Sequence, residues 1–190
     1  MRIIRHGSLV ARPWKNGGGE TREIACFPPG SSLDDFAWRL STASVAQDGP
    51  FSIFSGIDRR LYLLTGEGLN LRFGTGEAHR IGTDNHLDFR GEASVYGSLV
   101  NGPVVDFNIM VRRDRQRAHI EERTIAGPEK IALPWAPAAI FVRRGVLNIS
   151  GTSSSLTAQA HDTVMLEDAH APGVLADGDA EIIVIGFETL

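Results

Sequence analysis

The residue types best suited to chemistry gather between Pro13 and Glu23, in the run Pro-Trp-Lys-Asn-Gly-Gly-Gly-Glu-Thr-Arg-Glu. Consecutive glycines occur where the backbone must adopt a positive φ or approach another group closely. The bare N–H groups of such a loop, together with Lys15, can face a bound anion. The structural alternative is a glycine-rich turn between two strands, with Trp14 filling the core beside it. A nucleotide phosphate loop is excluded, because its second glycine, lysine and Ser/Thr are missing at the required spacing.

Polar residues also alternate along two runs that have the pattern of strands. Arg39 and Ser41 alternate with apolar residues, and so do Asp106 and Asn108, with Met110 next in the same phase. Because successive side chains of a strand point to opposite faces, each set shares one face. Such a face either meets water or lines the polar mouth of a small barrel. If Arg39 is buried, it needs a carboxylate partner, from Asp106 or from a ligand.

These two features together predict one ligand site. We expect the loop to close over the polar face, with Lys15 or Arg39 meeting a carboxylate of the ligand. The predicted ligand-binding residues are Trp14, Lys15, Asn16, Gly17, Gly18, Gly19, Thr21, Arg39, Ser41, Asp106, Asn108 and Met110.

A series of ordered motifs resembles the HutD/Ves family, which is associated with histidine utilisation in many bacteria. The motifs that carry the resemblance are Pro13–Gly19, Thr21–Ile24, Asp35–Ser41, Asp48–Ser52, Phe54–Arg59 and Asp106–Met110. The resemblance implies a two-cupin architecture and a link to histidine breakdown, whose intermediates urocanate and N-formylglutamate are small carboxylates. From about Thr124 onward it rests on length and strand pattern alone.

Short β-like runs bounded by Gly, Pro, Asp and Asn cover the chain, which predicts an all-β fold of barrel or jelly-roll type. A shift of roughly 77 residues superposes apolar positions of the two halves, as in an internal repeat. With the resemblance, this predicts a bicupin, two packed jelly-roll β-barrels in one chain. We place the first barrel at residues 1–123 and the second at 124–190, with N-terminal strands able to cross to the other barrel. The same shift sets Asp106 and Asn108 on Ile183 and Ile185, so only the first barrel is expected to keep a polar interior.

The composition of the chain argues against nucleic-acid and membrane partners. The chain of 190 residues has a net charge of −4 and no basic stripe, which argues against nucleic-acid binding. One cysteine, Cys26, cannot form an intrachain disulfide. The first residues lack an apolar signal region, and no run approaches the length of a membrane span. We therefore expect a cytoplasmic protein without nucleic-acid or membrane partners, and leave a homodimer open.

The histidines do not favour a metal centre. Metal-dependent cupins hold their ion with a His-x-His pair, a glutamate and a distant histidine, and this chain has no His-x-His. Its six histidines are dispersed: His6, His79, His86, His119, His161 and His170. We expect no metal and no cofactor.

Two functions remain open at this point. The first is a non-catalytic protein that binds a small carboxylate such as N-formylglutamate or urocanate, in a sensing or flux-limiting role. The alternative is a metal-independent cupin enzyme, an isomerase or hydrolase acting on such an acid, with Asp106 or Glu23 as general base.

Overall fold

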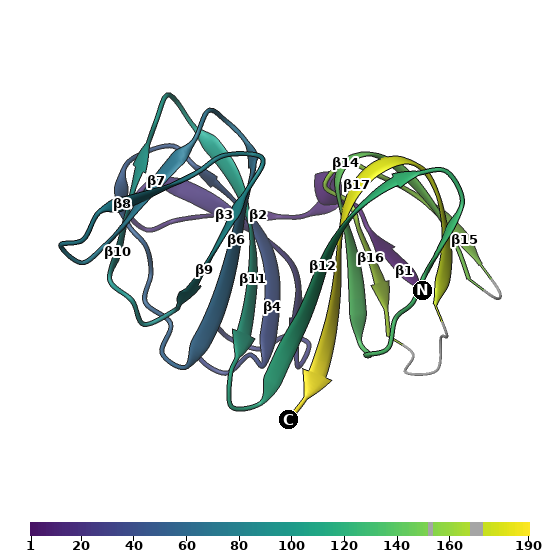
Figure 1. Cartoon of the computed structure of the whole chain (residues 1–190). Coiled ribbons are helices and arrows are strands. Elements are labelled where there is room, and N and C mark those ends of the chain that lie inside the picture. The colour runs from purple at the N-terminus through teal and green to yellow at the C-terminus, as the bar shows by residue number, and fades with distance from the viewer. Residues whose placement is uncertain (152–153, 168–172) are drawn as a thin grey trace. The chain divides into compact units, whose positions relative to one another are not determined.

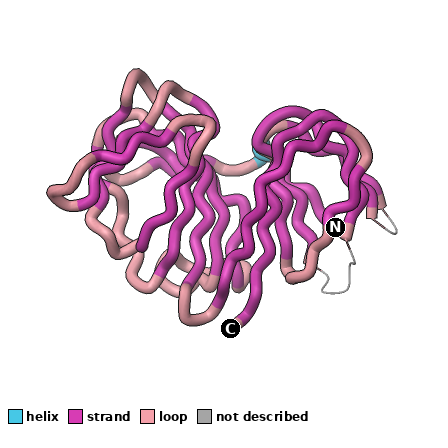
Figure 2. The backbone as a smooth tube through the Cα atoms, viewed as in Figure 1, coloured by secondary structure: helices cyan, strands magenta, loops and turns pink. Residues whose placement is uncertain are grey.

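The computed structural model describes residues 1–151, 154–167 and 173–190, and it consists of antiparallel strands joined by short loops (Figures 1 and 2). The single helical element in this described part is the 3-10 turn η1 (His6–Ser8). No helix there is long and apolar enough to cross a membrane. The chain divides into two compact units, the first unit being Leu9–Arg115 and the second unit Met1–Ser8 together with Gln116–Leu190. The all-β prediction is confirmed.

The first unit has two antiparallel sheets. Its strands are β2 (Ala11–Pro13), β3 (Gly19–Phe27), β4 (Trp38–Val45), β5 (Gly49–Pro50), β6 (Ile57–Thr65), β7 (Leu69–Phe73), β8 (Ala78–Ile81), β9 (His86–Arg90), β10 (Val95–Leu99) and β11 (Val104–Arg112). The six-stranded sheet has the order β2-β3-β4-β11-β6-β9, and the four-stranded sheet the order β5-β10-β7-β8. Leu61 and Leu63 of the larger sheet share an apolar core with Leu69 and Leu71 of the smaller one. The face of β6 that carries Leu61 and Leu63 is therefore the inner face of the first unit.

The second unit is built on one seven-stranded sheet. Its strands are β1 (Arg2–Ile4), β12 (Gln116–Ala126), β13 (Glu129–Ile131), β14 (Ala138–Ser150), β15 (Ser155–Gln159), β16 (Thr163–Leu166) and β17 (Val174–Thr189). The main path is β1-β16-β14-β17-β12, with β13 paired to β17 and β15 to β14. This sheet curls around an apolar core (Figure 1) that includes Ile140, Val142, Ile182 and Val184.

The boundary between the units differs from the predicted division into residues 1–123 and 124–190. Strand β12 pairs along its whole length with β17, from Gln116 opposite Thr189 to Ala126 opposite Asp179. Backbone pairing of this extent places β12 in the second unit, so the boundary falls at Arg115. The proline-rich segment 134–137 lies inside the second unit. One N-terminal strand does cross, because β1 pairs with β16.

The repeat seen in the sequence aligns residues that point to opposite faces of their sheets, so it is wrong by one residue. Asp106 lies opposite Leu63, on the inner face of the first unit. In the second unit the core-facing residues of β17 are Ile182 and Val184, and Ile183 and Ile185 belong to the other face. A one-residue shift exchanges the two faces of a strand. Asp106 and Asn108 are therefore not equivalent to Ile183 and Ile185, although the residues that do face the second core there are also apolar.

Candidate functional site

A cluster of polar side chains lies on the inner face of the six-stranded sheet, where strands β4, β11 and β6 are neighbours. Met110 of β11 sits between Arg39 of β4 and Arg59 of β6. In the adjacent row of the same face, Asn108 sits between Ser41 and Leu61. The next row places Asp106 between Ala43 and Leu63. Because cross-strand neighbours on one face lie about 5 Å apart, this register brings two arginines, an amide and a carboxylate together.

Arg59 is the most deeply embedded cation of the cluster, with 7% of its surface exposed. Its Nη2 donates to Oδ1 of Asn108 at 2.6 Å. The guanidinium lies over the rings of Phe51, Phe54 and Phe89, at 5.5, 5.6 and 4.8 Å from their centroids. Burial lowers the pKa of Arg59 to about 10, so it still carries its charge at neutral pH. Its buried Nε has no hydrogen-bond partner in the described part of the chain.

Asp106 is the buried carboxyl group of the cluster, and 1% of its surface is exposed. Nδ2 of Asn108 donates to Oδ1 of Asp106 at 2.6 Å, so Asn108 bridges Asp106 and Arg59. Burial raises the pKa of Asp106 to about 7, although the charge of Arg59 and hydrogen bonds from Ala43 and Asn108 oppose this. At neutral pH Asp106 therefore compensates only part of the charge of Arg59.

Arg39 has a partner other than the two that we predicted. Its Nε donates to Oε2 of Glu23 at 2.8 Å, and its Nη1 donates to Oγ of Ser41 at 3.2 Å. Glu23 lies opposite Ser41 in the pairing of β3 with β4, which explains how it reaches Arg39. The carboxylate that compensates Arg39 thus comes from Glu23, rather than from Asp106.

The glycine-rich run forms the tight turn between β2 and β3. The N–H of Gly17 donates to the carbonyl of Trp14 at 3.0 Å, and the N–H of Gly18 donates to Oδ1 of Asn16 at 3.0 Å. Gly17 has a φ of 72°. A Cβ on Gly19 would lie 2.3 Å from the carbonyl oxygen of Ser44. The glycines thus serve backbone geometry, and the N–H groups of Gly17 and Gly18, two of those expected to face an anion, are already bonded within the turn.

The side chains of this turn divide between the core and the solvent. Trp14 is half-buried, packs against the apolar core of the first unit and donates from Nε1 to Oγ1 of Thr21 at 2.8 Å. Thr21 pairs with Ala43, and Ala43 with Asp106, so Thr21 belongs to the row that contains Asp106. Lys15 and Asn16 are exposed at the tip. The structure therefore brings Thr21, and Trp14 through it, toward the polar cluster, and leaves Lys15 at the surface.

Arg59 and its three phenylalanines were missed by the sequence reasoning. The preceding residue, Asp58, pairs with Arg90 and Arg113 at the opposite face of the strand. The available signal was alternation, because Arg59 is in phase with the core residues Leu61 and Leu63. Glu23 had been considered only as a general base.

No group of three or more His, Cys, Asp or Glu side chains is placed to hold a metal ion within residues 1–151, 154–167 and 173–190. His170 lies outside the described residues. Independence from metals and cofactors stays a prediction.

The family model described as HutD matches residues 7–184 of the chain. The chain belongs to the HutD family. Protein Ves of Citrobacter koseri is 43% identical over 108 residues, which are 56% of this chain and 56% of that protein. An uncharacterized 21.2 kDa protein in the hutC 3′ region of Pseudomonas putida is 35% identical over 121 residues, covering 64% of this chain and 63% of that protein. The chain thus matches less than two thirds of the length of these curated relatives.

Solved structures extend the similarity over the whole HutD-family chain. HutD from Pseudomonas fluorescens SBW25 has a TM-score of 0.86 and 26% identity, covering 100% of this chain and 98% of that one. A conserved protein of unknown function from Pseudomonas aeruginosa PAO1 has a TM-score of 0.88 and 29% identity, covering 98% of both chains. A cupin 2 conserved barrel domain protein from Leptotrichia buccalis, 10% identical, has a TM-score of 0.64 and covers 98% of this chain and 96% of its own. The predicted bicupin fold is confirmed.

Proposed function

We propose that this HutD-family chain binds a small carboxylate metabolite on the inner face of the first unit, without transforming it. The observation that carries the proposal is the buried excess of positive charge. Arg39 is compensated by Glu23, but among the described residues the one carboxyl group that acts on Arg59 is Asp106, whose pKa of about 7 leaves it partly protonated at neutral pH. A buried cation without a full counter-charge is costly, and an incoming carboxylate would remove much of that cost.

The geometry supports recognition of a carboxylate in particular. The Nε of Arg59 lacks an acceptor among the described residues, and a guanidinium presents its N–H groups in a planar fork that matches two carboxylate oxygens. Phe51, Phe54 and Phe89 hold the guanidinium in an apolar setting, where a charge-assisted hydrogen bond is stronger than in water. Ser41 and Thr21 supply hydroxyl groups on the same face for other polar atoms of the ligand.

The histidine-utilisation link favours a particular set of acids. One solved relative is called HutD, and the Pseudomonas putida relative is described by its place beside hutC. We therefore place N-formylglutamate and urocanate first among the ligands, in a cytoplasmic protein that reports or limits flux through histidine breakdown. No nucleic-acid or membrane partner belongs to this proposal.

A metal-independent enzyme acting on the same acids is the second candidate function, and one observation favours it. A buried carboxyl group with a pKa near neutrality, such as Asp106, is suited to accept or donate a proton at physiological pH. In this alternative Asp106 is the general base, and Glu23 is less suited because it is held by Arg39.

Calorimetry and NMR on the same samples test both functions. N-formylglutamate, urocanate, glutamate and histidine are titrated into the protein, and the same mixtures are then followed by NMR for product. We expect saturable binding of at least one acid with no turnover. At 100 times its dissociation constant, such a ligand should stabilise the protein by about 2.7 kcal/mol in thermal unfolding. Product formation would favour the enzyme, and no binding of any of the acids would contradict the proposal.

A further inference from the structure

A pocket is lined entirely by residues of the second unit. Its volume is about 400 Å³, and the residues that define its character are His119, Glu121 and Arg123 of β12, Leu133 and Trp135 of the segment before β14, and Val184 of β17. Val184 belongs to the apolar core of this unit, so the pocket borders that core. Its size and its mixture of aromatic, apolar and few polar groups are those of a small-molecule site.

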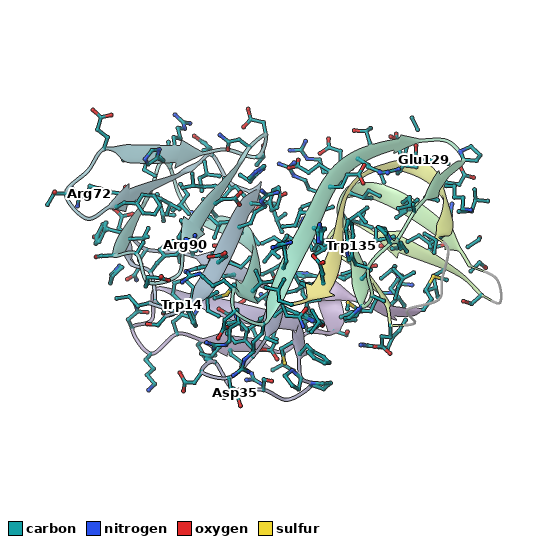
Figure 3. All side chains as sticks on the ribbon, turned by 60° about the horizontal axis from the view of Figure 1, so that its bottom comes forward. Trp14, Asp35, Arg72, Arg90, Glu129 and Trp135 are labelled. Carbon is teal, nitrogen blue, oxygen red and sulfur yellow. The ribbon has the colours of Figure 1, made fainter. Side chains whose placement is uncertain are left out.

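An aromatic wall forms one side of this pocket. The rings of His119 and Trp135 are stacked, with 3.5 Å between centroids and 4° between planes. Nε2 of His119 lies 2.8 Å from Oε2 of Glu188, which holds the imidazole in place. A Cβ on Gly186 would lie 3.1 Å from Cβ of Trp135, so a glycine at that position lets the indole lie against β17 (Figure 3). Several contacts therefore fix the wall in one arrangement.

The charges around the pocket favour a cation. Arg123 donates from Nε to Glu121 at 2.8 Å and from Nη1 to Glu129 at 3.4 Å. One guanidinium thus faces two carboxylates, which leaves a net charge of about −1 on this trio. The side chain of Glu121 is 57% exposed, so its carboxylate remains accessible. The charge of Arg123 is already compensated and would attract an anionic ligand only weakly, whereas a cationic ligand could form an ion pair with Glu121.

We propose that this pocket binds a small organic cation with a flat apolar body, such as a protonated amine attached to an aromatic ring. The ammonium group would lie near Glu121, and the ring against Trp135 and Leu133. A cation close to an indole also gains from the negative face of the ring. This preference is opposite to that of the first unit, where the buried cluster carries excess positive charge.

Three ligands of matched shape test the proposal: benzylammonium, benzyl alcohol and phenylacetate. The chain has three tryptophans, so a ¹⁵N-labelled sample gives three indole N–H signals, and a Trp135→Phe variant identifies that of Trp135. We expect benzylammonium to shift the Trp135 signal saturably in the low-millimolar range, benzyl alcohol to bind more weakly, and phenylacetate to bind weakest. Signals from an acid bound in the first unit are not counted, because only the Trp135 resonance is read.

Charge variants decide whether Glu121 is responsible. Glu121→Gln should weaken benzylammonium about 2- to 5-fold, as expected for one partly exposed charge pair, and should leave benzyl alcohol unchanged. Glu181→Gln is the matched control, because Glu181 is a partly exposed glutamate of β17 that pairs with Arg144 outside the pocket lining. The proposal is overturned if no ligand moves the Trp135 signal at concentrations about ten times higher than the low-millimolar range. It is also overturned if phenylacetate binds as tightly as benzylammonium, or if Glu121→Gln and Glu181→Gln change benzylammonium binding equally.

Discussion

Arg59 and Asn108, which are 49 residues apart in the sequence, share a 2.6 Å hydrogen bond between neighbouring strands β6 and β11. The same amide donates to Asp106. Asn108 therefore holds a buried cation and a buried carboxyl group at fixed positions while separating them. A direct ion pair would satisfy Arg59 within the protein, whereas this arrangement leaves part of its hydrogen-bonding capacity for a ligand.

Replacing Arg59 by methionine should abolish carboxylate binding and leave the fold intact. Methionine fills similar space among the phenylalanines, and Asp106, whose pKa is already about 7, stays protonated once the neighbouring charge is gone, so no unpaired charge is left buried. Arg60→Met is the matched control on the same strand, because Arg60 faces the other way and pairs with Asp88 at 2.6 Å. Calorimetry should show at least a 100-fold loss for Arg59→Met, equivalent to about 2.8 kcal/mol, and little change for Arg60→Met. Equal affinities of the two variants would place the site elsewhere.

Asp106 should make the protein less stable as the pH rises from about 4 to about 7. Its pKa in the fold, about 7, lies above the value near 3.9 of an unfolded aspartate. In this range the folded state holds more protons than the unfolded state, so the free energy of unfolding falls with rising pH. Asp106→Asn removes this dependence. In urea unfolding from pH 4 to 8, the free energy of unfolding of Asp106→Asn should rise relative to that of the parent by an amount on the order of a few kcal/mol. If the two free energies change with pH in the same way, the assignment is refuted.

Carboxylate binding should take up protons. The positive charge of Arg59 stabilises the ionised form of Asp106, and a ligand carboxylate near Arg59 would offset that stabilisation. The pKa of Asp106 therefore rises on binding, and the affinity for the carboxylate falls above pH 7. Calorimetry at pH 7.5 in two buffers with different ionisation enthalpies measures the number of protons. We expect a fraction of one proton for the parent and none for Asp106→Asn, and a parent without uptake would contradict the prediction.

Arg39→Ala should weaken binding of a carboxylate, because it leaves the charge of Glu23 uncompensated beside the polar face, and Arg39→Lys should restore only part of it. Lysine cannot reproduce the fork by which Arg39 contacts Glu23 and Ser41 together. The fold should persist, because Glu23 is partly exposed and can be hydrated when its partner is lost. Affinities from calorimetry and urea midpoints are compared for both variants. If Arg39→Ala binds the acid as tightly as the parent, Arg39 has no part in recognition.

Gly19→Ala should destabilise the protein by about 1 to 3 kcal/mol, the usual range for an overpacked position. The new Cβ would meet the carbonyl of Ser44 at 2.3 Å and the ring of Trp14 at 3.0 Å. Gly49→Ala is the control, because a Cβ there has no neighbour within 4 Å. Urea midpoints that coincide for the two variants would show that the turn tolerates a side chain.

The sequence was most informative about which side chains of one strand share a face, because that depends on the strand alone. Alternation predicted that Arg39 shares a face with Ser41, and Asp106 with Asn108 and Met110, because a strand side chain has only two directions. Pairing between strands was less accessible. Which carboxylate reaches Arg39 depends on the register of β3 against β4, which includes a bulge between Glu23 and Ala25. Alternation within one strand says nothing about such a shift.

The glycine run and the repeat show two further limits. Three glycines can expose amides to a ligand or close a tight turn, and only the bonds of Gly17 and Gly18 distinguish the two. An ungapped repeat can match apolar positions well and still be wrong by one residue, because Phe107 and Val184 are both apolar but belong to opposite faces. A one-residue error then reverses every conclusion about which side chains point inward.

The pairing of β1 with β16 joins Arg2 to Met165 and Ile4 to Thr163. During synthesis, β1 leaves the ribosome about 160 residues before its partner strand exists, so the second unit can close only after nearly the whole chain has been made. A fragment that begins at Gln116 would expose the backbone edge of β16, and an unpaired edge readily recruits a strand from another chain. Expression of the C-terminal half by itself is therefore expected to yield aggregates or strand-exchanged oligomers, which the addition of a peptide containing residues 1–8 should suppress.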